Sequence, residues 1–194
     1  ILKSFPFNEV EFKKEFGIKQ FLGNKKGLVI KKSLAAEPTC NIAGIVSGYH
    51  AEGAKTVIPA EARVKIDFRL VPNMDPKKQE IRLRKHLKSN GFGDIKIKVY
   101  HGEAAARTDS KHPFVSHVTS AASKSFGKYI LSVSSAGTGP MHSFTKILNA
   151  PAIAIGSTHV FSRIHSPNEY TRIDLLNKAT KCMCIILENF SKSR

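Results

Sequence analysis

The sequence predicts two structurally different parts, an antiparallel α+β layer followed by an α/β segment. Residues 61–72 (EARVKIDFRLVP) alternate between polar and apolar side chains, which is the period of a strand with one buried face. Residues 94–102 (DIKIKVYHG) repeat this alternation after a helical stretch. Strands that bury one face and expose the other are typical of antiparallel sheets.

The second part begins after Arg107. Its two strand-like stretches, 128–134 (KYILSVS) and 151–156 (PAIAIG), are mostly apolar and lie between helical segments. Apolar strands that alternate with helices are typical of a parallel sheet covered on both faces. We therefore divide the chain into residues 1–107 and 108–194.

The local signals predict the individual elements. A short helix is expected over residues 7–17. Asn8 can serve as its N-cap, Glu11 completes a capping box, and Phe7 with Phe12 fits a hydrophobic staple. Gly17 is the expected end of the helix. Residues 28–38 fit no single pattern. Residues 39–55 are typical of a strand that runs into a Gly-rich turn, and Asp75-Pro76 opens a helix that ends at Gly91.

Three further helices are predicted in the second part, over residues 112–127, 140–149 and 174–190. In the last of them, four side chains at helical spacing form one apolar stripe: Leu175, Ala179, Cys182 and Ile186.

The chain carries a formal net charge of +16, from 31 Lys and Arg against 15 Asp and Glu. Such a balance attracts phosphates, so a nucleic-acid-binding domain is one alternative. The basic residues are scattered, however, aromatic residues make up only 8%, and no nucleic-acid-binding signature is present. We therefore expect a solvated, Lys-rich surface without a nucleic-acid partner, or a chain whose charge is balanced by a more acidic segment elsewhere.

Cysteine usage and hydropathy indicate a cytoplasmic protein. No apolar run approaches the roughly 18 residues of a membrane span, and the first residues lack the core of a signal peptide. The three cysteines, Cys40, Cys182 and Cys184, fit reduced thiols, and the last two point to different faces of a helix, which argues against a metal site. Because the sequence lacks a starting Met, we expect it to begin within a longer protein.

Of the eight histidines, His165 is the best placed for chemistry. It lies in the loop FSRIHSPNEY (161–170), shortly after the apolar stretch 151–156. In open α/β sheets, ligands bind outside the carboxyl ends of the strands, where this loop and the AGTGP loop (136–140) would both lie. From the pattern alone, a metal ligand, a catalytic base and an ordinary solvated histidine all stay open.

Four segments together resemble the carnosinase-type dipeptidases in order and approximate spacing: PTCNIAGIVSGY, GAKTVIPAEARVKIDFRLVP, AGTGP and HSPNE. These dipeptidases belong to the dinuclear zinc metallopeptidases that also include aminoacylase and carboxypeptidase G. The resemblance runs from about Pro38 to the C-terminus. It implies that residues 1–107 form a lid (dimerisation) domain without its N-terminal part. Residues 108–194 would be the C-terminal part of an α/β catalytic domain.

The resemblance also implies roles for individual residues. His165 matches the last zinc ligand, and Arg69 matches a lid arginine that holds the free carboxylate of the substrate, often in the active site of the partner subunit. Thr56 matches a second lid position that contacts substrate. Thr138, with Gly137, matches a loop that holds the substrate carboxylate, and Glu169 would stabilise the loop of His165.

The sequence departs from the family pattern in its acidic residues. The family's His-x-Asp ligand motif and its Glu-Glu pair, which supplies the general base, occur nowhere in the 194 residues. We therefore expect no catalytic residue in this chain and no tight binding of zinc by it alone. The complete enzyme would hold two zinc ions.

The resulting hypothesis is that the chain is the C-terminal part of a zinc-dependent homodimeric metallopeptidase. Its substrates would be dipeptides or N-acyl amino acids with a free carboxylate, and it would not contact a membrane. The alternative from another class is a non-catalytic dimerisation module.

Overall fold

The computed structural model describes residues 1–135, 137–159 and 161–192, and the chain forms two compact units. Unit 1 comprises Ile1–Ala35 and Ala106–Arg194, and unit 2 comprises Ala36–Ala105. The division predicted at residue 107 differs from this grouping at the N-terminal end, because the first 35 residues belong to the same unit as the C-terminal half.

Helix α1 (Glu9–Glu15) begins and ends where the sequence predicts. Asn8 Oδ1 accepts hydrogen bonds from the backbone N–H groups of Val10 and Glu11, both at 3.2 Å. The rings of Phe7 and Phe12 lie 5.1 Å apart, as a hydrophobic staple requires. These contacts confirm the N-cap and the staple.

The unassigned stretch 28–38 is mostly helical. A 3₁₀ turn (Leu22–Asn24) leads into helix α2 (Leu28–Ala36), whose one buried residue is Ile30. The backbone N–H of Gly27 donates to Glu9 Oε1 at 2.6 Å and thereby ties α1 to the start of α2.

The core of unit 1 lies between helices α4 (Pro113–Phe126) and α5 (Ile173–Ser191). Its buried members come from both helices: Val118, Ala121, Cys182 and Ile186. Ile153 and Ile155 of the apolar stretch 151–156 pack against this cluster. The predicted stripe on the last helix is therefore confirmed, and Cys182 is buried while Cys184 is exposed, as their spacing predicts.

An ion pair marks the start of α5. Arg172 donates two hydrogen bonds to Asp174, from Nε at 3.0 Å and from Nη2 at 2.8 Å. Its guanidinium holds the pKa of the Asp174 carboxyl below the ordinary value. The carboxylate also lies in the first helical turn, where the helix dipole favours negative charge.

The predicted parallel sheet is not formed by the described residues. A strand needs a neighbouring strand, and neither 128–134 nor 151–156 is paired in the parts of the chain that the structure describes. The predicted helix over 140–149 is formed over residues 141–147, and Ser143–Ile147 (η2) is its π-helical part.

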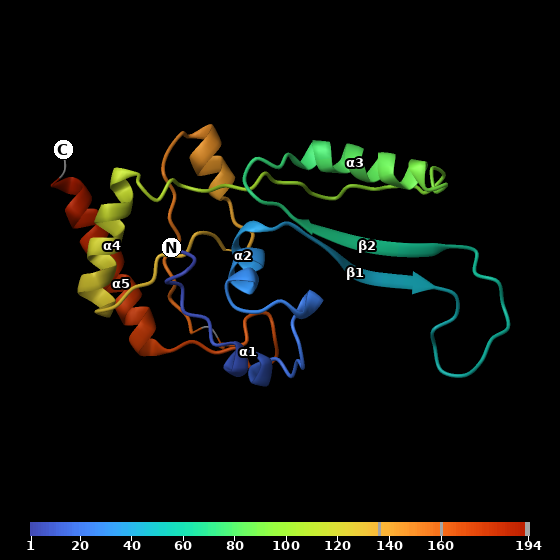
Figure 1. Ribbon diagram of the computed structural model, residues 1–194, viewed down its shortest axis with the longest axis horizontal. Coiled ribbons are helices and arrows are strands. Elements are labelled where there is room, and N and C mark those ends of the chain that lie inside the picture. Colours follow the sequence, from blue (N-terminus) through green and yellow to red (C-terminus); the bar gives the residue numbers. More distant parts are fainter. Residues whose placement is uncertain (136, 160, 193–194) are drawn as a thin grey trace. The chain divides into compact units, whose positions relative to one another are not determined.

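Unit 2 is built on one antiparallel pair of strands, β1 (Thr39–Ser47) and β2 (Ala62–Arg69), joined by the long loop 48–61 (Figure 1). Thr39 lies opposite Arg69 at one end, and Ser47 lies opposite Ala62 at the end that carries the loop. A β-bulge interrupts the register between Ile42 and Gly44.

Helix α3 (Pro76–Ser89) follows β2 and has the predicted cap. Asp75 Oδ1 accepts a hydrogen bond from the N–H of Lys78 at 2.8 Å, and Pro76 occupies the first turn. Residues 94–102 run alongside this helix (Figure 1), and Arg84 Nη2 donates to the carbonyl of Ile97 at 3.3 Å.

Two predictions for unit 2 are wrong. Residues 94–102 are extended but are not assigned to a strand, because the described sheet consists of β1 and β2 only. The apolar face of β2 is not buried either: Val64, Ile66 and Phe68 are 51%, 42% and 39% exposed. The alternation is present, but no described element covers the face closely.

Among the described helices, none combines the length and the apolar character that crossing a membrane would require.

The packing of α5 against α4 predicts that two neighbouring residues of α5 contribute differently to the free energy of unfolding. Ile186 is 7% exposed and Leu187 is 68% exposed. Ile186→Ala should lower the free energy of unfolding by about 2–5 kcal/mol, because it leaves a cavity against α4. Leu187→Ala, the matched control, should change it by about 0.5 kcal/mol or less. Urea denaturation followed by circular dichroism measures both, and equal losses would show that the core lies elsewhere.

Candidate functional site

Four polar side chains lie together at the end of the sheet where β1 begins and β2 ends. We call Thr39, Asn41, Asp67 and Arg69 the polar quartet. In the strand register, Thr39 lies opposite Arg69 and Asn41 lies opposite Asp67, so all four share one face. Asn41 Nδ2 donates to Thr39 Oγ1 at 3.1 Å, and Arg69 Nε donates to Asp67 Oδ2 at 2.8 Å.

Arg69, the predicted substrate residue, is thus held at a strand end and remains accessible. Its side chain is 44% exposed and that of Asp67 is 45% exposed. A guanidinium offers donors in a planar fork that matches the geometry of a carboxylate. The polar quartet can therefore present a charged, oriented donor group to an anionic ligand.

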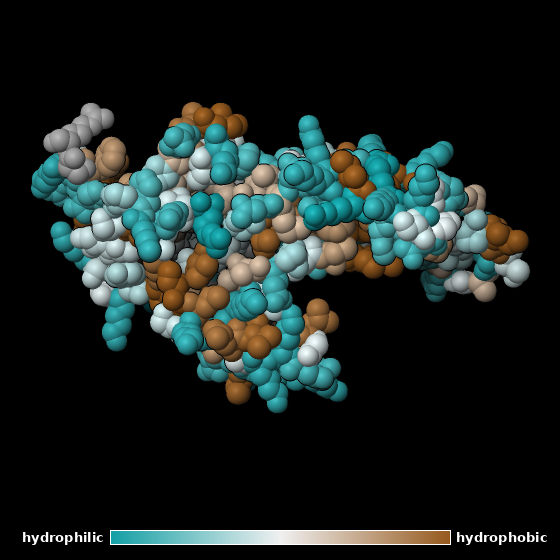
Figure 2. Space-filling model, turned by 45° about the horizontal axis from the view of Figure 1, so that its top comes forward, coloured by the Kyte–Doolittle hydropathy of each residue, from teal (hydrophilic) through white to brown (hydrophobic). Residues whose placement is uncertain are grey.

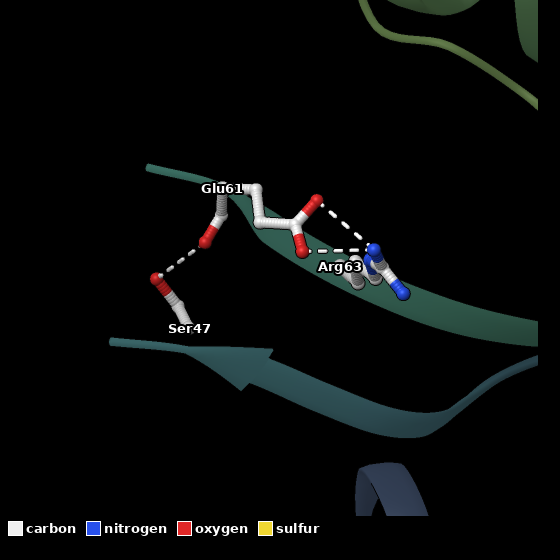
Figure 3. A network of polar contacts seen from close by, with 3 residues as sticks. All are labelled: Ser47, Glu61 and Arg63. Atoms are coloured by element: carbon white, nitrogen blue, oxygen red, sulfur yellow. Dashed lines mark hydrogen bonds and ion pairs between the residues drawn. The ribbon is translucent and has the colours of Figure 1, made fainter. Parts of the chain in front are cut away.

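A second arginine on the same face of β2 provides an internal comparison. Arg63 Nη2 lies 2.8 Å from one carboxylate oxygen of Glu61 and 3.1 Å from the other (Figure 3). The Glu61 carbonyl accepts a hydrogen bond from Ser47 Oγ at 3.4 Å. Arg63 lies opposite the apolar Val46, and its side chain is 75% exposed, so this pair lacks the polar neighbours of Arg69.

Thr56 lies in the loop 48–61, at the other end of the sheet. Its neighbours Lys55 and Val57 line a hollow of about 450 Å³ together with the strand ends Val46 and Arg63. Apolar side chains reach the surface at this end of unit 2, at the right of Figure 2, and Ile58 is 92% exposed. Thr56 itself is exposed.

The hairpin separates the two predicted substrate residues of the lid. Arg63, at the hollow beside Thr56, lies six positions before Arg69, which corresponds to roughly 20 Å along a strand. A dipeptide spans at most about 7 Å. One small ligand therefore cannot contact Thr56 and Arg69 of the same chain.

His165 lies in an exposed, tightly turned loop of unit 1. Its φ of 63° is in the left-handed region, and its backbone N–H donates to Glu169 Oε2 at 3.4 Å. The Tyr170 N–H donates to the carbonyl of Ser162 at 3.1 Å and closes the loop. Glu169 accepts this bond and thereby stabilises the loop, as expected. His165 itself is exposed.

The AGTGP loop also belongs to unit 1, and its first residue, Ala136, lies outside the described residues. The N–H of Gly137 donates to Ser135 Oγ at 3.2 Å, and Thr138 is exposed. The substrate roles of Gly137 and Thr138, and a cleft shared with the loop of His165, stay predictions.

The described residues do not form a metal centre by themselves. Among them, no group of three or more His, Cys, Asp or Glu side chains is placed to hold a metal ion. His165 can offer one imidazole nitrogen, whereas structural and catalytic zinc sites take three or four protein ligands. A zinc ion therefore does not fit the donor set that the described residues offer by themselves.

Arg69 was predicted from the sequence, but its partner Asp67 and the neighbours across the sheet, Thr39 and Asn41, were missed. The signal for Asp67 was available, because residues two apart on a strand point to the same face. Thr39 and Asn41 come beside Asp67 and Arg69 through the register between β1 and β2. That register includes a bulge that could not be predicted from the sequence.

Comparison with known proteins places the chain among peptidases. Residues 17–94 match the family model of the peptidase dimerisation domain. The chain is 28% identical over 207 residues to the Cys-Gly metallodipeptidase DUG1 of Saccharomyces cerevisiae, covering 100% of this chain and 41% of that protein. It is 31% identical over 97 residues to the Beta-Ala-His dipeptidase of Rattus norvegicus, covering 47% of this chain and 20% of that protein.

A solved structure agrees in fold over nearly the whole chain. The M20 family metallo-carboxypeptidase Sso-CP2 of Sulfolobus solfataricus superposes with a TM-score of 0.87 at 36% identity, covering 96% of this chain and 43% of that one. The chain thus spans about two fifths of the length of DUG1 and of Sso-CP2.

The donor set predicts weak zinc binding by these 194 residues. A lone imidazole competes with water and gains little from preorganisation, so calorimetry on the isolated chain should detect no tight zinc site. His165→Ala should leave the titration unchanged within error. Tight binding that survives His165→Ala would show that a metal site exists on other residues.

Proposed function

Because this chain belongs to the M20 peptidase family and carries its dimerisation domain, we propose that it forms the subunit-joining and substrate-holding part of a dimeric metallopeptidase. Its substrates are small peptides or N-acyl amino acids with a free carboxylate. The observation that carries the proposal is the placement of Arg69, an accessible guanidinium held at a strand end beside polar neighbours.

The relatives support this class of substrate. A Cys-Gly dipeptidase, a Beta-Ala-His dipeptidase and a carboxypeptidase all act, by their names, on substrates that end in a free carboxylate. A charge-assisted, bidentate bond from an arginine is the strongest way for a side chain to recognise that group. We also propose that Thr138 and Gly137 are substrate-binding residues.

The complete enzyme is proposed to use zinc, since DUG1 and Sso-CP2 are named as metallopeptidases. When bound, the metal would supply a Lewis acid for the scissile carbonyl. His165 is the one ligand that we assign to this chain. Its loop, held by the bond to Glu169, would keep the imidazole at the surface where further ligands can approach.

The length of the hairpin suggests how the subunits cooperate. Since one small substrate cannot contact both Thr56 and Arg69 of one chain, we assign these residues to different active sites of the dimer. Each active site then takes Arg69 from one subunit and Thr56 from the other. A domain whose family is named for dimerisation fits this arrangement.

Arg69→Met in the complete protein tests whether Arg69 binds the carboxylate of the substrate. A hydrogen bond to a charged group is worth about 1.5–3 kcal/mol, so kcat/KM for a dipeptide should fall roughly ten- to a hundredfold. Lys65→Met is the matched control, because it removes a cation from the same face of the same strand and lies outside the hollow beside Thr56. It should leave kcat/KM within about twofold, since a surface substitution away from the proposed contacts with substrate has little effect. Equal effects of the two substitutions would refute the role of Arg69.

The assignment of residues to two active sites requires a stable association. Light scattering on the complete protein at micromolar concentration should give the mass of a dimer. A monomer that retains full activity would contradict the shared active sites.

A further inference from the structure

Within the polar quartet, the side chain bonded to Arg69 has no assigned role. We propose that Asp67 is the positioning residue for Arg69, holding its guanidinium in the orientation that receives the substrate carboxylate. This inference rests on the proposed function of Arg69.

The geometry of the bond supports an orienting role. Arg69 Nε donates to Asp67 Oδ2 at 2.8 Å, the length of a charge-assisted hydrogen bond. The guanidinium is planar, so a partner on Nε restricts the direction in which the rest of the group faces. A long side chain that is already restricted loses less conformational entropy when it binds a ligand.

The neighbours across the sheet favour this pairing. Asn41, opposite Asp67, uses its Nδ2 to donate to Thr39 Oγ1 at 3.1 Å, and Thr39 lies opposite Arg69. The two side chains on β1 are uncharged, so Arg69 is the one cationic member of the polar quartet. Asp67 and Arg69 are therefore each other's charged partner within it.

The ion pair of Glu61 with Arg63, at the other end of β2, shows that a two-residue spacing on a strand is enough to form such a pair. Glu61 and Arg63 are also two residues apart and 2.8 Å from each other, but their side chains are 66% and 75% exposed and Arg63 lies opposite Val46. Exposed ion pairs contribute little to stability. We therefore expect the protein to fold when the carboxylate of Glu61 or of Asp67 is removed. A change in kcat/KM on substitution of Asp67 then reports on its role in the site.

A competing effect of Asp67 has the opposite sign. Its negative charge also repels a carboxylate that approaches Arg69. If repulsion outweighs orientation, removing Asp67 raises kcat/KM. If Asp67 positions Arg69, removing it lowers kcat/KM, and only while Arg69 is present.

The experiment is a double-mutant cycle in the complete protein, with a dipeptide as substrate. Asp67→Ala should lower kcat/KM about three- to tenfold, the scale set by freeing one long side chain. Asp67→Asn keeps an oxygen that can accept from Nε, so it should recover most of this loss. In the Arg69→Met background, Asp67→Ala should have no further effect, because the two residues act as one unit. Glu80→Ala is the matched control, because it removes a carboxylate that is paired with an arginine, Arg84 at 2.7 Å, and that lies outside the proposed contacts with substrate. It should leave kcat/KM unchanged.

The outcomes separate this inference from the function on which it rests. If Arg69→Met leaves kcat/KM unchanged, the proposed function of Arg69 fails and the positioning role fails with it. If Arg69→Met lowers kcat/KM but Asp67→Ala does not, or raises it, only the positioning role is overturned. A loss on Asp67→Ala that is the same with and without Arg69 also overturns it, since a merely structural effect is additive.

Discussion

The antiparallel pairing of β1 with β2 is the constraint on which the proposed function depends. It fixes which side chains share a face, and it brings Thr39 and Asn41 beside Asp67 and Arg69. It also fixes the distance between the polar quartet and the loop 48–61. The same strand pairing therefore assembles the polar quartet and keeps it away from Thr56 in the loop 48–61.

Both units leave apolar surface exposed. In unit 2, one face of the two-stranded sheet carries Ile42, Ile45, Val64, Ile66 and Phe68, and two strands alone cannot cover that face. In unit 1, the exposed apolar side chains include Ile147, Leu148 and Leu187, which are 74%, 66% and 68% exposed. Burial of apolar surface is the main favourable term in association, so these faces are suited to pack against further protein. That agrees with a family model named for dimerisation.

The sequence predicted the local elements better than the sheets. The cap of Asn8, the staple of Phe7 and Phe12, and the apolar stripe of α5 are set by residues close in sequence, so each was readable. Among the described residues, the strand over 94–102 and the parallel strands are not formed, because a strand depends on a neighbouring strand that periodicity does not specify. Alternation likewise identified the faces of β2 correctly but could not tell whether any element covers them.

The candidate site shows the same limit. The family resemblance supplied Arg69 and Thr56, and it gave the role of a metal ligand to His165, which its place after an apolar stretch had already singled out. Alternation alone would have left Arg69 as one solvated charge among several. Asp67 could have been identified from its two-residue spacing to Arg69, whereas Thr39 and Asn41 became visible only through the strand register. The separation of Thr56 from Arg69 was likewise hidden, because thirteen residues of sequence can fold back as easily as they can span a hairpin.

The central claim, that Arg69 and Thr56 of one chain serve different active sites, is tested most directly with hybrid dimers. Arg69→Met and Thr56→Ala subunits would be co-expressed with different tags, and the dimer that carries both tags would be purified. In a symmetric dimer with shared active sites, one site of this hybrid receives both defects and the other receives none. The account predicts that the hybrid recovers about half of the wild-type kcat/KM, far above either parent dimer. Activity no higher than that of the parents would mean that both residues act within one subunit's site, and would contradict the account.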